Sequence, residues 1–269
     1  MINLHTHSKI SDGILEPPEV AEKAKEAKLE DWALCDHDSI AGLIKAAKKS
    51  SELNIGFING IEISCQHKFH ILGLGFNANN VTLLKHSNHQ RIIHRERAIS
   101  IIAILEENGF VVNKSILQKE QGNITVFNIY QHTATELSFS EFAKLWIYKG
   151  SPHYIKIERL TFKQAIELIH DAEGIAVSAH LGHTFKKELH NLENAIKKLK
   201  EAGIDALEVF STKHNEEQTR ILHRLALKYD LAMTVGTDFH GHSKNKIGEV
   251  IKSYRLPFDK AKILKLVIR

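Results

Sequence analysis

The chain opens with the stretch INLHTHSKISDG (residues 2–13), which places two histidines and an aspartate around the end of a short apolar run. This run predicts a strand that ends at His5 and His7, with Asp12 in the loop that follows. Side chains two residues apart in a strand point to the same side, so the two imidazoles are expected to aim together. Such a pair is a weak signal alone, and its meaning depends on the other strand ends.

Six more short apolar runs predict strands, and amphipathic helical stretches separate most of them. The six are DWALCDH (31–37), GFINGIEIS (56–64), KFHILGLGF (68–76), GIAVSAHLG (174–182), DALEVFS (205–211) and LAMTVGTDFH (231–240). One helix is expected to begin at a Ser39 cap and another at a Thr161 cap. Alternation of strands and helices predicts an α/β fold with a mainly parallel sheet.

The alternation stops between about Leu83 and Leu160. Residues 83–109 predict one long helix, and the sequence after them is helical and irregular. We interpret residues 83–160 as a mainly helical insertion that packs over a main domain formed by residues 1–82 and 161–269.

Composition is that of an ordinary globular protein, with 43% hydrophobic and 25% charged residues in 269. The net charge of +4 comes without a dense Lys/Arg block, so it permits an anionic substrate without demanding nucleic acid. Cys35 and Cys65 form no C-x-x-C pair, which favours a reducing compartment and core positions. No apolar run reaches the ~18 residues of a membrane span, and no signal segment is recognised, so a cytoplasmic location is expected.

Residue types that bind metals recur at the predicted strand ends. They are His5, His7, Asp12, His37, Glu62, His70, His180, Asp238 and His240. Parallel strands bring their carboxyl ends to one face, which is where barrel enzymes carry their active sites. Any one histidine at a strand end is more often capped or solvated, but six histidines with three carboxylates are not expected by chance. The other histidines are interpreted as surface residues, among them His86, His89, His170, His190 and His223.

Nine ligand candidates exceed the three or four that a zinc site uses, so two or three ions are expected. Mixed imidazole and carboxylate donors suit zinc, manganese or iron better than calcium or magnesium. Three divalent ions beside three carboxylates leave the pocket positive, which favours a phosphate substrate. Such ions lower the pKa of a bound water and stabilise the charge of an in-line displacement.

Six motifs, in this order, resemble those of the PHP (polymerase and histidinol phosphatase) family. They are HTHSKISDG, CDHD, GIEIS, HILGLGF, AHLG and TDFHG. The resemblance implies a distorted, TIM-like (β/α)7 barrel with a two- or three-metal phosphoesterase site, and it assigns metal binding to the nine residues named above. The subgroup most resembled comprises nucleoside 3′,5′-bisphosphate phosphatases and 5′-to-3′ exoribonucleases, which carry a helical insertion between strands 4 and 5.

Two departures from the family pattern concern the substrate side. The AH motif is followed by Leu181 rather than proline. The subgroup's Arg-Pro-His stretch, which helps to hold substrate, is replaced by Val126-Phe127-Asn128. The residues that bind the substrate phosphate are therefore expected to differ from those of the subgroup.

Cations on the long helix offer a second phosphate site. By resemblance to the subgroup, Arg91, His94 and Arg97 are the candidates. The alternative is a solvated helix face, in which Glu96 balances these cations.

The predicted activity is that of a metal-dependent phosphoesterase, in which a metal-bound hydroxide attacks phosphorus. The expected substrate is a nucleoside 3′,5′-bisphosphate or a short RNA 5′ end, with no obligate protein partner and no membrane. One alternative is a small-molecule phosphatase of the histidinol phosphate type. Another is a non-catalytic module that binds nucleotide or RNA and keeps a remnant metal site for structure.

Overall fold

Seven strands form one sheet in the computed structural model, which describes residues 1–241 and 246–248. The strands are β1 (Ile2–Thr6), β2 (Asp31–Leu34), β3 (Gly56–Ser64), β4 (His70–Leu74), β5 (Ile175–Ser178), β6 (Ala206–Ser211) and β7 (Ala232–Gly236). Each lies within a predicted run, and their order in the sheet is the order in the chain. The strand predictions are therefore confirmed.

Strand β4 runs against its neighbours on both sides. It pairs antiparallel with β3, from Gly60 opposite Leu74 to Ser64 opposite His70, and antiparallel with β5. The other four pairings are parallel, as predicted. His70 is the first residue of β4. Because β4 is antiparallel to its neighbours, this first residue lies at the edge of the sheet where the parallel strands end.

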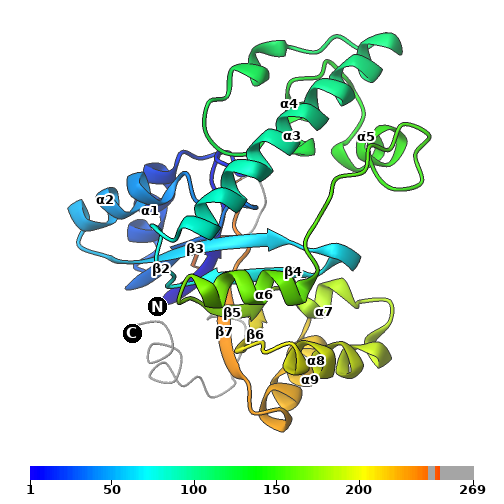
Figure 1. The fold of residues 1–269 in the computed structure, drawn as a ribbon. Helices are drawn as coiled ribbons and strands as arrows, with labels where there is room; N and C mark the ends of the chain where they lie inside the picture. The colour runs from blue at the N-terminus through cyan, green and yellow to red at the C-terminus, as the bar shows by residue number, and fades with distance from the viewer. Residues whose placement is uncertain (242–245, 249–269) are drawn as a thin grey trace.

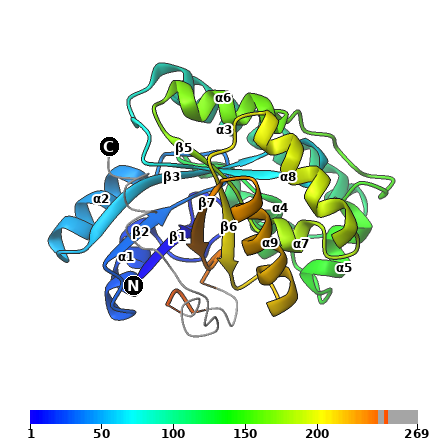
Figure 2. The same ribbon diagram turned by 90° about the horizontal axis from the view of Figure 1, so that it is seen from below.

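The sheet closes almost completely into a barrel. Beyond β7 the chain runs beside β1, where the His7 N–H donates to the Phe239 carbonyl at 2.8 Å and Thr6 bridges Phe239. Viewed from below, helices surround the strands (Figure 2). The distorted seven-stranded barrel is confirmed, with the carboxyl ends of the parallel strands on one rim.

Helices cover the outside of the barrel with their apolar faces. They are α1 (Pro17–Glu26), α2 (Leu43–Glu52), α6 (Phe162–Asp171), α7 (Leu181–Thr184), α8 (Leu192–Glu201) and α9 (Glu216–Lys228), with short 3₁₀ turns η1 (Gln66–Lys68) and η3 (Leu189–Asn191). Thr161 caps α6 as predicted. The Ser39 cap is wrong, because residues 40–42 form a turn in which the Leu43 N–H reaches the Ile40 carbonyl at 3.3 Å. Helix α2 therefore begins only at Leu43.

The segment between β4 and α6 lies above the barrel in Figure 1, and it carries a second apolar cluster. It contains α3 (Val81–Glu107), η2 (Lys114–Gln118), α4 (Val126–Gln131) and α5 (Phe139–Trp146). Helix α3 starts after an Asn80 cap, and its first turn belongs to the barrel, because Leu83 packs in the main core. The boundary at residues 83–160 stays a prediction.

Other expectations concern the core and the chain end. Cys35 and Cys65 are buried and unbonded to each other, as expected. No helix in residues 1–241 and 246–248 has the length and apolarity to span a bilayer. The predicted barrel segment 161–269 extends over residues 242–245 and 249–269, which lie outside the described residues.

Candidate metal centre

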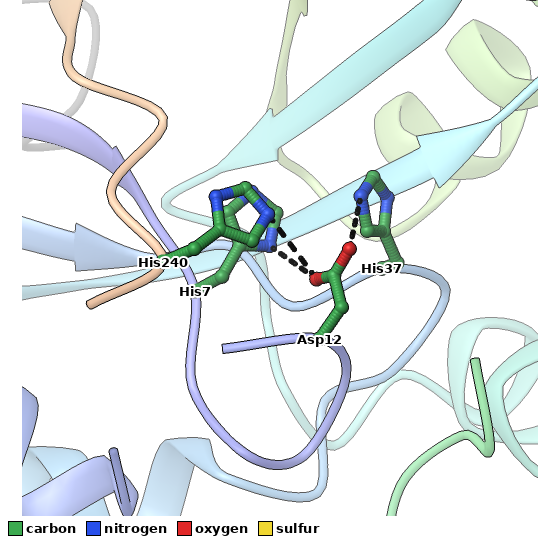
Figure 3. Close-up of side chains that lie close together, drawn as sticks. All are labelled: His7, Asp12, His37 and His240. Carbon is green, nitrogen blue, oxygen red and sulfur yellow. Dashed lines mark ion pairs between the residues drawn. The ribbon is translucent and has the colours of Figure 1, made fainter. Parts of the chain in front are cut away.

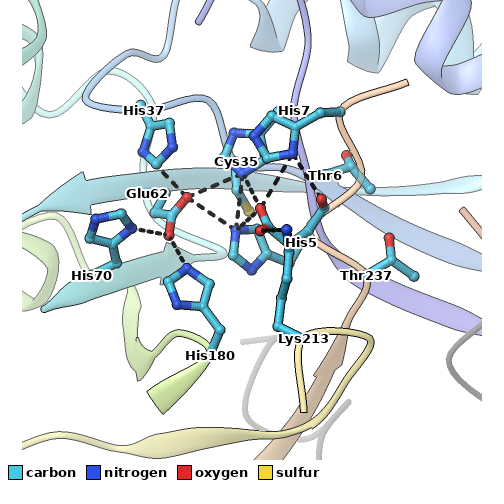
Figure 4. Close-up of polar contacts among 12 residues, drawn as sticks. His5, Thr6, His7, Cys35, His37, Glu62, His70, His180, Lys213 and Thr237 are labelled. Carbon is cyan, nitrogen blue, oxygen red and sulfur yellow. Dashed lines mark hydrogen bonds and ion pairs between the residues drawn. The ribbon is translucent and has the colours of Figure 1, made fainter. Parts of the chain in front are cut away.

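A single buried carboxylate, that of Glu62 near the end of β3, lies at the middle of the candidate site (Figure 4). Its Oε2 is 3.1 Å from Nε2 of His5 and of His7, and 3.3 Å from Nδ1 of His37. These imidazoles come from β1 and from the residues after β1 and β2. Three imidazoles from two neighbouring strand ends therefore converge on one oxygen.

The other Glu62 oxygen faces the opposite side of the cluster. Its Oε1 is 2.8 Å from Nδ1 of His70 and 3.0 Å from Nε2 of His180. Because β4 is reversed, His70 reaches this point from the start of its strand. Glu62 therefore presents both of its oxygens to imidazoles, with three rings at Oε2 and two at Oε1.

Asp238 supplies a second carboxylate from the segment after β7. Its Oδ1 is 3.1 Å from Nε2 of His7 and 3.5 Å from Nε2 of His5. With Glu62 these residues form a fully buried group of four whose donor atoms lie within 4.8 Å of one another. Both ends of the closed barrel, β1 and the segment after β7, contribute to this group.

A second group forms around Asp12, in the loop after β1 (Figure 3). Asp12 Oδ1 is 3.3 Å from Nε2 of His240, and Oδ2 is 3.7 Å from Nε2 of His37. His7 completes this group, with Nδ1 at 3.9 Å from Oδ1. A third group comprises His37, Glu62 and His70. These three overlapping groups contain eight of the nine predicted residues. The ninth, His180, belongs to none of them but adjoins the cluster through its contact with Glu62.

The donors fit divalent ions. The Nδ1 atoms of His7 and His180 are buried, and neither has a hydrogen-bond partner in the described part of the chain. The Nε2 atoms of His5 and His7 face each other at 3.0 Å, so either one of them carries a proton or both lone pairs face a cation. A cation beside the two Nε2 atoms would accept a lone pair from each ring, and imidazole with carboxylate is a donor set for zinc, manganese or iron.

Charges within the cluster are strongly coupled. Burial alone would lower the pKa of His7, but hydrogen bonds to Asp238 and Glu62 raise it to about 10. Burial would raise the pKa of Glu62 and of Asp238, yet neighbouring imidazoles hold both well below their usual range. Burial lowers the pKa of His37 to about 4, so this ring is neutral at neutral pH. Positive charge on imidazoles such as His7 therefore balances the buried carboxylates of Glu62 and Asp238.

Glu208, in β6, orients two of the histidines and was missed by sequence analysis. Its Oε1 accepts from Nδ1 of His5 at 2.9 Å, and its Oε2 accepts from the backbone N–H of His180 at 2.7 Å. Gly236 passes so close that an added Cβ would lie 2.2 Å from Oε1. A carboxylate that fixes a ligand's ring is a common support of metal sites. The available signal was a charged residue inside an apolar strand, DALEVFS.

A cavity of about 420 Å³ opens beside the cluster. It is lined by Asp12, His37, Ser64, His70, His94, Arg97, Thr125, Val126, Phe127, Phe139, Tyr148, Arg159, Lys213 and His240. Two of the three substrate-binding candidates from the sequence, His94 and Arg97, line this cavity, whereas Arg91 is not among the lining residues. Sequence analysis missed Arg159, Tyr148 and Lys213, which reach the cavity from segments without a motif.

His94 differs from its expected cationic character. It is 8% exposed, and burial lowers its pKa to about 4, so the ring is neutral. His86 is also not a surface residue: α3 lies against the barrel there, with His86 Nε2 buried 3.7 Å from Asp38 Oδ1. His89, His170 and His190 are exposed as predicted, and His223 is half-buried.

Comparison with known proteins agrees with this geometry. The PHP domain model matches residues 3–214. The chain is 30% identical over 246 residues to a 5′-3′ exoribonuclease of Haemophilus influenzae, covering 88% of this chain and 89% of that protein. It is 31% identical over 252 residues to a 3′,5′-nucleoside bisphosphate phosphatase of Chromobacterium violaceum, covering 89% and 87%.

A solved structure from Bifidobacterium adolescentis shares the fold, with a TM-score of 0.84, 23% identity and coverage of 99% of this chain and 95% of that one. Fold, cluster and relatives together define a metal-dependent phosphoester hydrolase. Within that class, the chain belongs to the PHP domain family.

Proposed function

We propose that this enzyme hydrolyses a phosphate ester of a nucleotide that carries a second phosphate, either a nucleoside 3′,5′-bisphosphate or the 5′ end of a short RNA. The observation that carries the proposal is one cavity with three kinds of wall. The metal cluster forms one wall, two arginines form another, and aromatic rings form the third. A bisphosphorylated nucleotide has one chemical group for each wall.

The nine clustered residues are proposed to hold two or three ions of zinc, manganese or iron. The buried group around His5, Glu62 and Asp238 would hold one ion, and the group around Asp12 and His240 another. The group that includes His70 would hold a third. Glu62 belongs to two of these groups, so it would be a ligand common to both. When bound, such ions supply an acidified water and polarise phosphoryl oxygens.

Lys213 adds a cation where the cluster meets the cavity. Its Nζ is 3.0 Å from Asp238 Oδ2. Burial would lower the pKa of Lys213, but Asp238 raises it, so the ammonium stays charged. A fixed ammonium at this point orients a phosphate oxygen and offsets the charge that develops during displacement.

Two guanidinium groups suit a second phosphate. Burial and the positive charge of Arg159 lower the pKa of Arg97, so the two cations lie close enough to repel each other. The Nε of Arg97 donates to the Ile155 carbonyl at 3.2 Å, which fixes its direction. An anion between two such groups relieves the repulsion and accepts hydrogen bonds from planar donors.

Aromatic side chains suit the nucleobase. Phe127 and Phe139 both line the cavity, with ring centroids 5.2 Å apart and planes at 90°. Phe127 stands where the subgroup's Arg-Pro-His stretch is replaced. Base–aromatic stacking contributes about 1–3 kcal/mol per base and tolerates any base. This part of the cavity thus favours a nucleotide over a purely aliphatic phosphate.

The two free cysteines in the core suit a reducing compartment, and we propose a cytoplasmic location on that basis.

A substrate panel tests the proposal. Manganese-loaded enzyme should release phosphate or mononucleotide from nucleoside 3′,5′-bisphosphates or short 5′-phosphorylated RNA much faster than from histidinol phosphate. Arg97→Ala should raise KM for the bisphosphate at least about 10-fold, because charge-assisted hydrogen bonds contribute about 1.5–3 kcal/mol, and should leave nucleoside monophosphates unaffected. Preference for histidinol phosphate would establish the small-molecule alternative. Tight RNA binding without hydrolysis would establish the non-catalytic one.

A further inference from the structure

We propose that residues 119–123 of the insertion, called the clamp below, position the side of the metal cluster that Asp12 and His37 form. This inference rests on the proposed metal site. It assigns to the insertion a role in metal binding in addition to lining the cavity. The clamp lies in the loop between η2 and α4, far in sequence from both ligands.

Asn123 provides the main link. Its side chain is fully buried, and its Nδ2 donates to the backbone carbonyl of His37 at 2.7 Å. Its backbone N–H donates to the carbonyl of Ile10 at 2.8 Å. Ile10 lies two residues before Asp12, so one residue of the insertion ties together the two loops that carry Asp12 and His37.

Lys119 strengthens the same link. Its Nζ donates to the carbonyls of Ile10 at 3.1 Å and Ser11 at 3.4 Å, and to the carbonyl of Asn123 at 2.7 Å. These contacts reach the residue directly before Asp12. A half-buried ammonium that serves several backbone carbonyls fixes the loop more firmly than water would.

Gly122 shows how closely the two segments approach. Its φ is +75°, and an added Cβ would lie 2.0 Å from the Ile10 carbonyl oxygen. Only glycine combines this backbone conformation with this contact. The clamp therefore depends on a close approach that a single methyl group would prevent.

The clamp acts on part of the cluster. Within residues 1–241 and 246–248, the hydrogen bonds of Lys119 and Asn123 to the barrel end on Ile10, Ser11 and His37. The buried group of His5, His7, Glu62 and Asp238 is instead supported by Glu208 and by the barrel strands. Loss of the clamp should thus weaken the ion near Asp12 and His37 and spare the ion in the buried group.

Metal titration of chelator-stripped full-length protein tests this. Manganese or zinc is added while affinity and stoichiometry are measured by calorimetry and elemental analysis. Asn123→Ala and, separately, Gly122→Ala should lower the affinity of at least one ion by about 10- to 100-fold, the usual effect of losing a support of a ligand. The tightest ion should bind as in the wild type. Asn113→Ala is the matched control, because the side chain of exposed Asn113 accepts from the Ser115 N–H at 3.0 Å, within the insertion itself.

The outcomes separate this inference from the proposed function. A wild-type protein that binds no metal contradicts the proposed function. Normal metal binding by the wild type and by either folded clamp variant overturns the clamp while leaving the metal site intact. Equal weakening of every ion also overturns it, because that pattern indicates general destabilisation rather than selective positioning.

Discussion

Glu208→Gln is the substitution that tests the architecture of the buried metal group most sharply. The carboxylate accepts from the His5 Nδ1–H at 2.9 Å and from the His180 N–H at 2.7 Å, and it is 1% exposed. Glutamine has the same shape but offers one acceptor and one NH₂ group. Its NH₂ must therefore face one of these two donors.

The structure sets the expected magnitude. Leaving one buried donor unsatisfied costs about 1–3 kcal/mol, which is roughly a 5- to 150-fold change in an equilibrium constant. This agrees with the about 10- to 100-fold loss of metal affinity that follows removal of a ligand's hydrogen-bonded support. We therefore expect Glu208→Gln to lose between about 10- and 100-fold in affinity for the ion near His5, and a similar factor in kcat/KM.

The assay is calorimetric titration of stripped protein with manganese, followed by phosphate release at saturating metal. Glu217→Gln is the control, because Glu217 is exposed at the start of α9 and carries the same change of charge. Partial rescue of activity by excess metal is expected for Glu208→Gln. Wild-type affinity and wild-type kcat/KM in this variant would refute the role of Glu208 in orienting His5 and His180.

Of three further predictions, two concern metal binding and one concerns the nucleobase. Metal affinity should rise with pH through the neutral range, because the pKa of His7 is raised to about 10 and its proton must leave before an ion binds. The dependence of binding heat on the buffer measures that proton release, and a metal affinity that does not change with pH would contradict the prediction. Chelation should lower Tm by about 5–10 °C, since an ion at 100 times its Kd adds about 2.7 kcal/mol; calorimetry that shows equal Tm with and without metal would argue against a native metal site. Phe127→Ala should raise KM for nucleoside bisphosphates about 5- to 150-fold, and Phe127→Trp should keep KM near the wild-type value, because the nucleobase stacks on an aromatic ring. Equal KM values in the wild type and both variants would contradict stacking of the nucleobase on Phe127.

The strands and most of the metal cluster could be predicted because the signals are local. Apolar runs such as DALEVFS are short and lie between turns and helices, so their pattern favours a strand. Candidate ligands such as His5, Glu62 and Asp238 stand at or near strand ends, so the closure of the barrel brings them together.

What the sequence did not reveal depends on contacts between distant segments. The reversal of β4 follows from pairing with β3 and β5, and no local pattern specifies strand direction. Glu208 is recognisable as a support only once His5 is known to lie 2.9 Å away. Likewise, burial of His86 and neutrality of His94 arise from the way α3 packs against the barrel, which periodicity along one helix does not encode.

The most direct test of the central claim is phosphate release from a nucleoside 3′,5′-bisphosphate by chelator-stripped protein before and after manganese is returned. The account predicts no activity in the stripped protein and full recovery with metal. It also predicts activity below about 1% of wild type in His7→Ala and Asp238→Ala under the same loading, since both remove ligands on which the ions depend. Undiminished turnover by stripped protein, or by either variant, would contradict it.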